Sequence, residues 1–123
     1  APSITIINEL AKKGASFKVY DPIASNEAKK WLKSINDKIT YCENEYEAMK
    51  GCDALLIITE WNQFRNLDLQ RVKNLLKQPY FFDFRNLYKI DDMEEKGFMY
   101  FGTGQGYRGN YTIKSLDEVA ATI

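Results

Sequence analysis

The fold is decided by Asp53-Ala54-Leu55-Leu56-Ile57-Ile58-Thr59, near the middle of the chain. Every residue from Ala54 to Ile58 is apolar, with no alternation of polar and apolar positions. A strand with this pattern is buried on both faces, as in a parallel sheet covered by helices on each side. The apolar run is also far shorter than the roughly 20 residues that a helix needs to cross a bilayer. These residues therefore predict a central strand of an α/β domain.

Helix and strand signals alternate on either side of this strand. Near the start, Ile4, Ile7 and Leu10 share one face at helical spacing, and Gly14 follows where a helix would stop. A strand over residues 3–7 is the competing interpretation, because Ile and Thr favour strands. Further strands are predicted at residues 16–20, 39–41, 80–83 and 98–101, and further helices at 26–35, 46–50, 69–76 and 91–96.

This order of elements predicts one domain over residues 1–123, with a Rossmann-like, three-layer α/β/α fold and a mostly parallel sheet. Residues 105–123 are expected to form a loop and a short helix, because Ser115 to Glu118 has the pattern of a capping box that would open a helix through Ala121. A doubly wound domain usually opens with its central strand, whereas this chain opens with a helix. We therefore expect the first strand to be missing, which would leave a gap or exposed sheet edges that invite self-association.

Composition excludes several classes of function. The 17 Lys and Arg residues balance 17 Asp and Glu residues, so neither a nucleic-acid partner nor binding to a membrane surface is expected. The sequence has no His, the commonest general base and zinc ligand, so neither a metal site nor a catalytic triad is expected. Its two cysteines, Cys42 and Cys52, are too few for a disulfide framework and indicate reduced thiols in the cytoplasm.

Candidate ligand-binding residues lie where strands end, because α/β sheets bind ligands beyond the carboxyl ends of their strands. Arg85 lies in one such position, and its guanidinium is a planar fork of donors suited to an anionic or hydroxyl-rich ligand. The alternative is a structural arginine that pairs with Asp83 or with a helix end. The segments that qualify by position are residues 20–22, 59–61, 83–86 and 102–106.

Two of these segments have two interpretations each. Asp21 stands where a dinucleotide-binding fold places its ribose-binding acid, but the phosphate-binding glycines are missing, which favours a simple turn at Asp21-Pro22. Thr59, Glu60 and Trp61 either line the ligand cleft or cap the following helix, with Trp61 packed below it.

Short blocks in a fixed order carry a family resemblance. They are Pro2-Ser3-Ile4, Gly14-Ala15, Val19-Tyr20-Asp21-Pro22, Tyr46-Glu47-Ala48, Asp53-Ala54, Thr59-Glu60-Trp61, Phe64-Arg65, Phe82-Asp83-Phe84-Arg85-Asn86-Leu87-Tyr88 and Gly97-Phe98-Met99-Tyr100. Over residues 1–104 the chain resembles the UDP-binding C-terminal domain of the UDP-glucose/GDP-mannose dehydrogenase family. The Thr-Glu-Trp and Phe-Arg blocks are closest to its UDP-glucose 6-dehydrogenase branch.

The resemblance implies a fragment of a three-part enzyme that oxidises UDP-glucose to UDP-glucuronate for polysaccharide biosynthesis. In that family an N-terminal domain binds NAD, a central region carries the catalytic cysteine, and the C-terminal domain binds the UDP-sugar. The fragment is therefore expected to hold no cofactor itself, to contact the UDP-sugar and the rest of its own polypeptide, and to be inactive alone. Arg85 matches the family's substrate-contacting arginine, and Asn86, Thr59, Glu60 and Trp61 are further candidates.

Two alternatives and two departures from the family pattern accompany this interpretation. The intact enzyme could instead act on GDP-mannose or a UDP-N-acetylhexosamine, or the fragment could be an α/β module that binds nothing. Phe84 stands where the family usually has Gly, and we expect its large side chain to alter the backbone or the ligand fit beside Arg85. Gln105 stands where Gly-Arg or Gly-Lys is common, so a cation is lost there.

Overall fold

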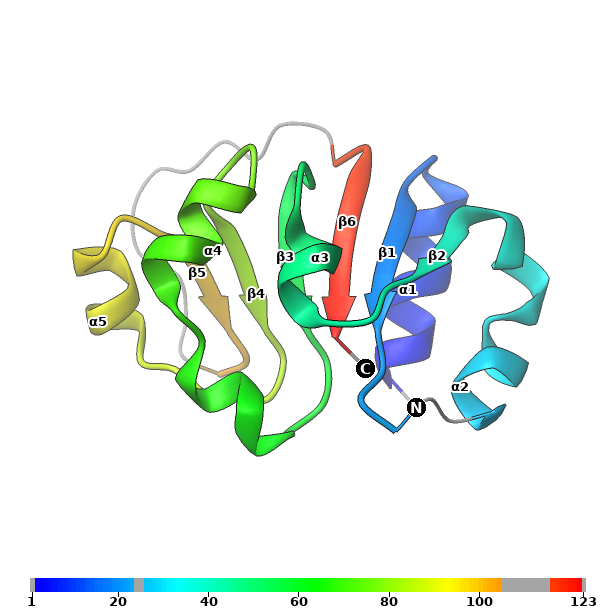
Figure 1. Cartoon of the computed structure of the whole chain (residues 1–123), viewed down its shortest axis with the longest axis horizontal. Coiled ribbons are helices and arrows are strands. Elements are labelled where there is room, and N and C mark those ends of the chain that lie inside the picture. The colour runs from blue at the N-terminus through cyan, green and yellow to red at the C-terminus, as the bar shows by residue number, and fades with distance from the viewer. Residues whose placement is uncertain (1, 24–25, 105–115, 123) are drawn as a thin grey trace.

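A parallel sheet forms the centre of the molecule, which a computed structural model describes over residues 2–23, 26–104 and 116–122. Its strands, among these residues, are β1 (Ser16–Tyr20), β2 (Ile39–Tyr41), β3 (Ala54–Ile57), β4 (Tyr80–Asp83), β5 (Met99–Gly102) and β6 (Glu118–Thr122). They stand in the order β2-β1-β6-β3-β4-β5 (Figure 1). Every neighbouring pair is parallel. The predicted Rossmann-like α/β fold with its parallel sheet is confirmed.

Helices cover both faces of the sheet. In Figure 1, α3, α4 and α5 lie in front of the strands and α1 lies behind them. None of the helices in the described part of the chain is both long and apolar enough to cross a membrane. The helices are α1 (Pro2–Lys12), α2 (Asn26–Trp31), α3 (Glu45–Met49), α4 (Leu69–Leu75) and α5 (Ile90–Glu95), with 3₁₀ helices η1 (Lys33–Lys38) and η2 (Asn62–Asn66).

Local signals set most of the helix ends. The Asp68 carboxylate accepts the Arg71 N–H at 3.2 Å and caps α4, as its position before an apolar helical face predicts. Gly14 has a φ of 99° after α1, a conformation that favours glycine, so the competing strand over residues 3–7 is wrong. The helix predicted over residues 26–35 ends early, and the chain continues as the 3₁₀ helix η1.

The central strand β3 is buried on both faces, as its sequence predicts. Leu55 and Ile57 belong to a cluster beneath α3, α4 and α5. Ala54 and Leu56 belong to a second cluster, which includes Ile7 of α1. All four β3 side chains are at most 1% exposed. The strand therefore joins the two layers of helices through one continuous apolar wall.

The strand between β1 and β3 is β6, which corrects two sequence-based expectations. The helix expected through Ala121 is wrong, because Val119 pairs with both Phe17 of β1 and Ala54 of β3. Its side chain and those of Ala120 and Ala121 are fully buried. Alanine and a capping-box pattern favour helix locally, but pairing on both sides and complete burial override that preference. The expected gap in the sheet is filled, and among the described strands β2 and β5 stand at its two edges.

Asp53 anchors the start of β6. Its Oδ2 accepts the N–H groups of Asp117 and Glu118, at 2.9 and 3.1 Å. Beyond β3, the N–H of Ile58 donates to the carbonyl of Thr122 at 3.1 Å. The pairing of β6 with β3 thus continues at both ends of the strand. Self-association through the edges of β2 and β5 stays a prediction.

Replacing Ala120 by proline should lower the free energy of unfolding by about 3 kcal/mol or more, because proline cannot donate to the ladder of an inner strand. The matched control is Ala120→Gly, which keeps the N–H and should cost about 1 kcal/mol. Urea unfolding followed by circular dichroism measures both. Equal losses for the two variants would contradict the inner position of β6.

Candidate functional site

The carboxyl ends of the strands meet at one edge of the sheet, where the arrowheads point in Figure 1. Arg85 follows the end of β4 at this edge. A cavity of about 310 Å³ is lined there by Ile58, Thr59, Glu60, Trp61 and Arg85. The structure therefore brings together Arg85 and the 59–61 segment, which the sequence analysis named separately. Asn86 does not line this cavity.

Asp83 shapes the loop that carries Arg85. One carboxylate oxygen accepts the N–H of Arg85 at 3.1 Å. The other accepts the N–H of Tyr88 at 3.0 Å and the hydroxyl of Tyr100 at 2.7 Å. Asp83 is 1% exposed, and a buried carboxylate requires such partners. The contact between Asp83 and Arg85 is thus made through the backbone, and the Arg85 guanidinium points elsewhere.

The Arg85 guanidinium pairs with Glu60 across the cavity wall. Arg85 Nη2 donates to Glu60 Oε1, and Arg65 Nη2 lies 4.0 Å from Glu60 Oε2. The side chains are 45%, 50% and 46% exposed for Arg85, Glu60 and Arg65, so the pair is open to solvent. The hydrogen bond from Arg85, followed by its charge, lowers the pKa of Glu60. In the sequence, Arg65 stands out only as part of the Phe64-Arg65 block, and that pattern does not predict its position beside Glu60.

Thr59 and Trp61 line the cavity, and neither side chain caps the following helix. The helix η2 begins after Trp61 without a side-chain capping hydrogen bond. Trp61 is 36% exposed. Within the described part of the chain, the buried hydroxyls of Thr59 and Thr122 have no hydrogen-bond partner. Of the two interpretations of residues 59–61, the structure favours the cavity lining.

Asn86 holds the neighbouring turn together. Its φ of 54° is left-handed, and Nδ2 donates to the carbonyl of Thr103 at 2.5 Å. The Thr103 hydroxyl donates in turn to the carbonyl of Phe84 at 3.4 Å. Phe84 itself packs, half-buried, against the cluster beneath α1. Gln105 and Gly106, named from the sequence, lie outside the described residues.

The turn after β1 does not fit a dinucleotide. Asp21 Oδ1 accepts the N–H of Ile23 at 3.0 Å, which is a local turn and supports the simpler interpretation of Asp21-Pro22. The turn has no glycine from Tyr20 to Ile23, whereas a pyrophosphate needs close approach to the backbone. The residues present therefore do not fit NAD at this position.

Neither cysteine has an activated thiol that could act as a nucleophile. Both are free thiols. Cys52 is fully buried, and desolvation, followed by the charge of Glu118, raises its pKa to about 12. Desolvation raises the pKa of Cys42 as well. Since the thiolate is the reactive form, both side chains stay protonated and inert at neutral pH.

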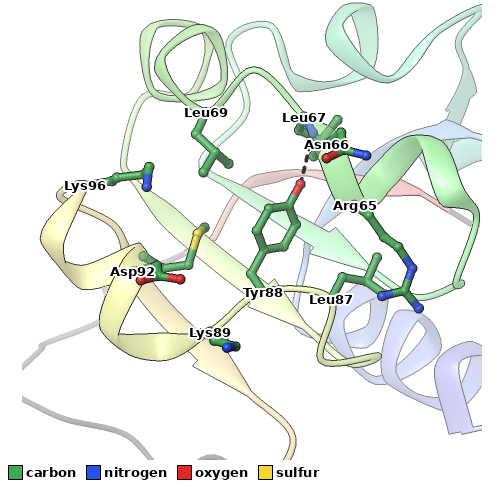
Figure 2. Close-up of a pocket in the computed structure, with 10 residues that line it drawn as sticks. Arg65, Asn66, Leu67, Leu69, Leu87, Tyr88, Lys89, Asp92 and Lys96 are labelled. Carbon is green, nitrogen blue, oxygen red and sulfur yellow. Dashed lines mark hydrogen bonds between the residues drawn. The ribbon is translucent and has the colours of Figure 1, made fainter.

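A larger cavity of about 440 Å³ lies between η2 and α5 (Figure 2). Arg65 lies at one end of it and Lys96 at the other, with Tyr88 between them. The Tyr88 hydroxyl accepts the N–H of Leu67 at 3.0 Å and donates to the carbonyl of Phe64 at 2.5 Å. Burial raises the pKa of Tyr88 to about 12, so this hydroxyl remains protonated in its internal bonds. The smaller cavity with Arg85 is the better candidate, because it lies at the carboxyl edge of the sheet, where α/β folds bind ligands.

Comparison with known proteins identifies the family to which the chain belongs. Residues 1–90 match the model of the UDP binding domain of the UDP-glucose/GDP-mannose dehydrogenase family. The chain belongs to this family. The matched region, residues 1–90, contains Arg85, Glu60 and Arg65. All residues that line the smaller cavity therefore lie within the UDP binding domain of this family.

Curated family members are similar over most of the chain. UDP-glucose 6-dehydrogenase TuaD of Bacillus subtilis is 40% identical over 105 residues, which are 85% of this chain and 22% of TuaD. UDP-glucose 6-dehydrogenase of Rhizobium meliloti is 37% identical over 85% of this chain and 23% of its own length. The chain thus spans less than a quarter of these two relatives. The solved UDP-D-ManNAc dehydrogenase of Pyrococcus horikoshii shares the fold, with a TM-score of 0.51, 16% identity, and coverage of 81% of this chain and 29% of that one.

Asp83→Ala should lower the free energy of unfolding by about 3 kcal/mol, because it leaves the N–H groups of Arg85 and Tyr88 without their acceptor. The Tyr100 hydroxyl loses its bond to Asp83 but keeps the carbonyl of Tyr88 at 2.9 Å. Tyr100→Phe, which removes one of those hydrogen bonds, should cost about 1–2 kcal/mol. Denaturant unfolding measures the two losses. Hydrogen exchange should also show that the amides of Arg85 and Tyr88 lose protection in Asp83→Ala. Retained protection at both amides would contradict the role of Asp83.

The pKa of Glu60 should rise in Arg85→Gln towards the ordinary glutamate value of about 4.3. The folded-state pKa lies below that value, so the ion pair stabilises the fold above the ordinary pKa and its contribution is lost as the pH falls through the folded-state pKa. Carbon-detected NMR titration of the side-chain carboxyl gives the pKa in both proteins. An unchanged pKa in the variant would show that the pair is absent in solution.

Proposed function

We propose that this chain is the nucleotide-sugar-binding domain of an NAD-dependent UDP-glucose 6-dehydrogenase. One observation carries the proposal: the exposed guanidinium of Arg85 lies at the carboxyl edge of a parallel sheet, in a cavity inside the region that matches a UDP binding domain. The relatives named above are UDP-glucose 6-dehydrogenases, which favours UDP-glucose over the other sugar nucleotides of the family.

The residues of the cavity suit such a ligand. The planar fork of Arg85 can donate two parallel hydrogen bonds to a phosphate of the diphosphate group. Thr59 lines the same cavity, and its buried hydroxyl lacks a hydrogen-bond partner among the described residues. Trp61 lines the same wall with part of its ring exposed, and this ring would report on ligand binding through its fluorescence. In this role Arg85 binds and orients the ligand and transfers no proton.

The oxidation itself belongs to other parts of the intact enzyme. NAD accepts hydride when it is bound, but the turn after β1 does not fit a dinucleotide and neither cysteine is activated. The relatives are more than four times as long as the matched region, which leaves room for an NAD-binding domain and a catalytic cysteine in them. The rest of the polypeptide is therefore the domain's partner. The two free thiols support a cytoplasmic location.

The 123-residue chain should bind UDP and UDP-glucose saturably, and Arg85→Ala should weaken binding about tenfold or more. Tryptophan fluorescence titration, with calorimetry as a second readout, measures the dissociation constants. Arg71→Ala is the matched control, because Arg71 faces the ring of Tyr46 at 4.0 Å and does not line the cavity.

Three results would count against the proposal. Saturation absent at millimolar UDP would identify a module without ligand affinity. Preference for GDP over UDP would favour the GDP-mannose branch. Reduction of NAD by the chain alone with UDP-glucose would contradict the proposal that other parts of the intact enzyme carry out the oxidation.

A further inference from the structure

Glu60 stands between two arginines that belong to different parts of the fold. Arg85 lies in the loop after β4, and Arg65 lies in η2. Each carboxylate oxygen faces a different guanidinium, with Oε1 bonded to Arg85 Nη2 and Oε2 4.0 Å from Arg65 Nη2. Arg65 also lines the larger cavity in Figure 2, while Glu60 and Arg85 line the smaller one. The ion-paired residues therefore lie on the boundary between the two cavities, with Arg65 lining one and Glu60 and Arg85 lining the other.

A stronger anion can replace Glu60 as the partner of the two arginines. All three side chains are about half exposed, and solvent-exposed pairs of this kind contribute little stability. The lowered pKa of Glu60 keeps its carboxylate charged at neutral pH. A diphosphate carries more negative charge than a carboxylate and matches the same guanidinium fork. It is therefore a stronger partner for the two arginines than Glu60.

We infer that Glu60 is an internal counter-anion, which holds Arg65 and Arg85 at the cavity in the free protein and is displaced by the diphosphate of the ligand. This inference rests on the proposed function and adds Arg65 to the anion-binding residues. In the free protein the Glu60 carboxylate offsets part of the positive charge of the two arginines. After displacement its carboxylate remains beside the bound diphosphate and opposes it, which limits the affinity.

The test compares Glu60→Gln with the unaltered chain in titrations with UDP, inorganic pyrophosphate and uridine. Glu60→Gln should bind UDP and pyrophosphate about two- to fivefold more tightly, because it frees the guanidinium groups and removes a like charge. Uridine, which has no phosphate, should bind equally to both proteins. The gain should shrink when salt is raised to about 0.5 M. Glu9→Gln on α1 is the control, since it removes one charge from a residue that pairs with Lys12 and does not line the cavity.

A double-variant cycle identifies the partners. The gain from Glu60→Gln should disappear in an Arg85→Gln background and be reduced in an Arg65→Gln background. Unchanged or weaker UDP binding by Glu60→Gln, in a protein whose own UDP binding depends on Arg85, would overturn the inference and leave the proposed function intact. Tighter pyrophosphate binding without any UDP binding would support the counter-anion and reject the proposed ligand. Failure of both proteins to bind either anion would reject both.

Discussion

The backbone ladder that β6 forms with β1 and β3 holds the whole sheet together. Without it the strands would fall into two groups, β2 with β1 and β3 with β4 and β5. Pairing on both sides places all the carboxyl ends at one edge in a common register. The loop with Arg85 and the segment with Glu60 face each other only because β3 and β4 run side by side in this sheet. The candidate site therefore depends on the pairing of β3 with β4 and on the contact of β3 with β6, to which the cavity residue Ile58 contributes its N–H.

Much of the fold could be predicted from the sequence, because its signals are local. The apolar run from Ala54 to Ile58, the Asp68 cap and the stop at Gly14 each act within a few residues. The strand β6 could not be predicted in the same way. Its Ala120 and Ala121 favour helix, and only the slot between two distant strands makes them extended and fully buried. The same long-range pairing explains why the expected gap in the sheet is absent.

The candidate site was predictable in part for a related reason. Arg85 is identified by its place after a strand and by its neighbours, both of which the sequence contains. Its ion pair with Glu60 joins residues 25 positions apart and depends on how two loops leave the sheet. The support that Asp83 gives to the loop likewise uses Tyr100, which comes from the next strand. Sequence patterns thus identify Arg85, whereas its contacts with Glu60 and Asp83 can be found only in the three-dimensional structure.

The position of β6 also has a consequence for how the chain acquires its structure. This strand leaves the ribosome after the other five, yet Ser16 beside it bonds a residue 101 positions away. In the described part of the chain, β6 is the strand that occupies the inner edges of β1 and β3. Pairing over such separations is slow, and unpaired edges expose a growing polypeptide to its neighbours on the polysome. Among the described strands, β6 is therefore the last to be synthesised, and its arrival completes the pairing between β1 and β3.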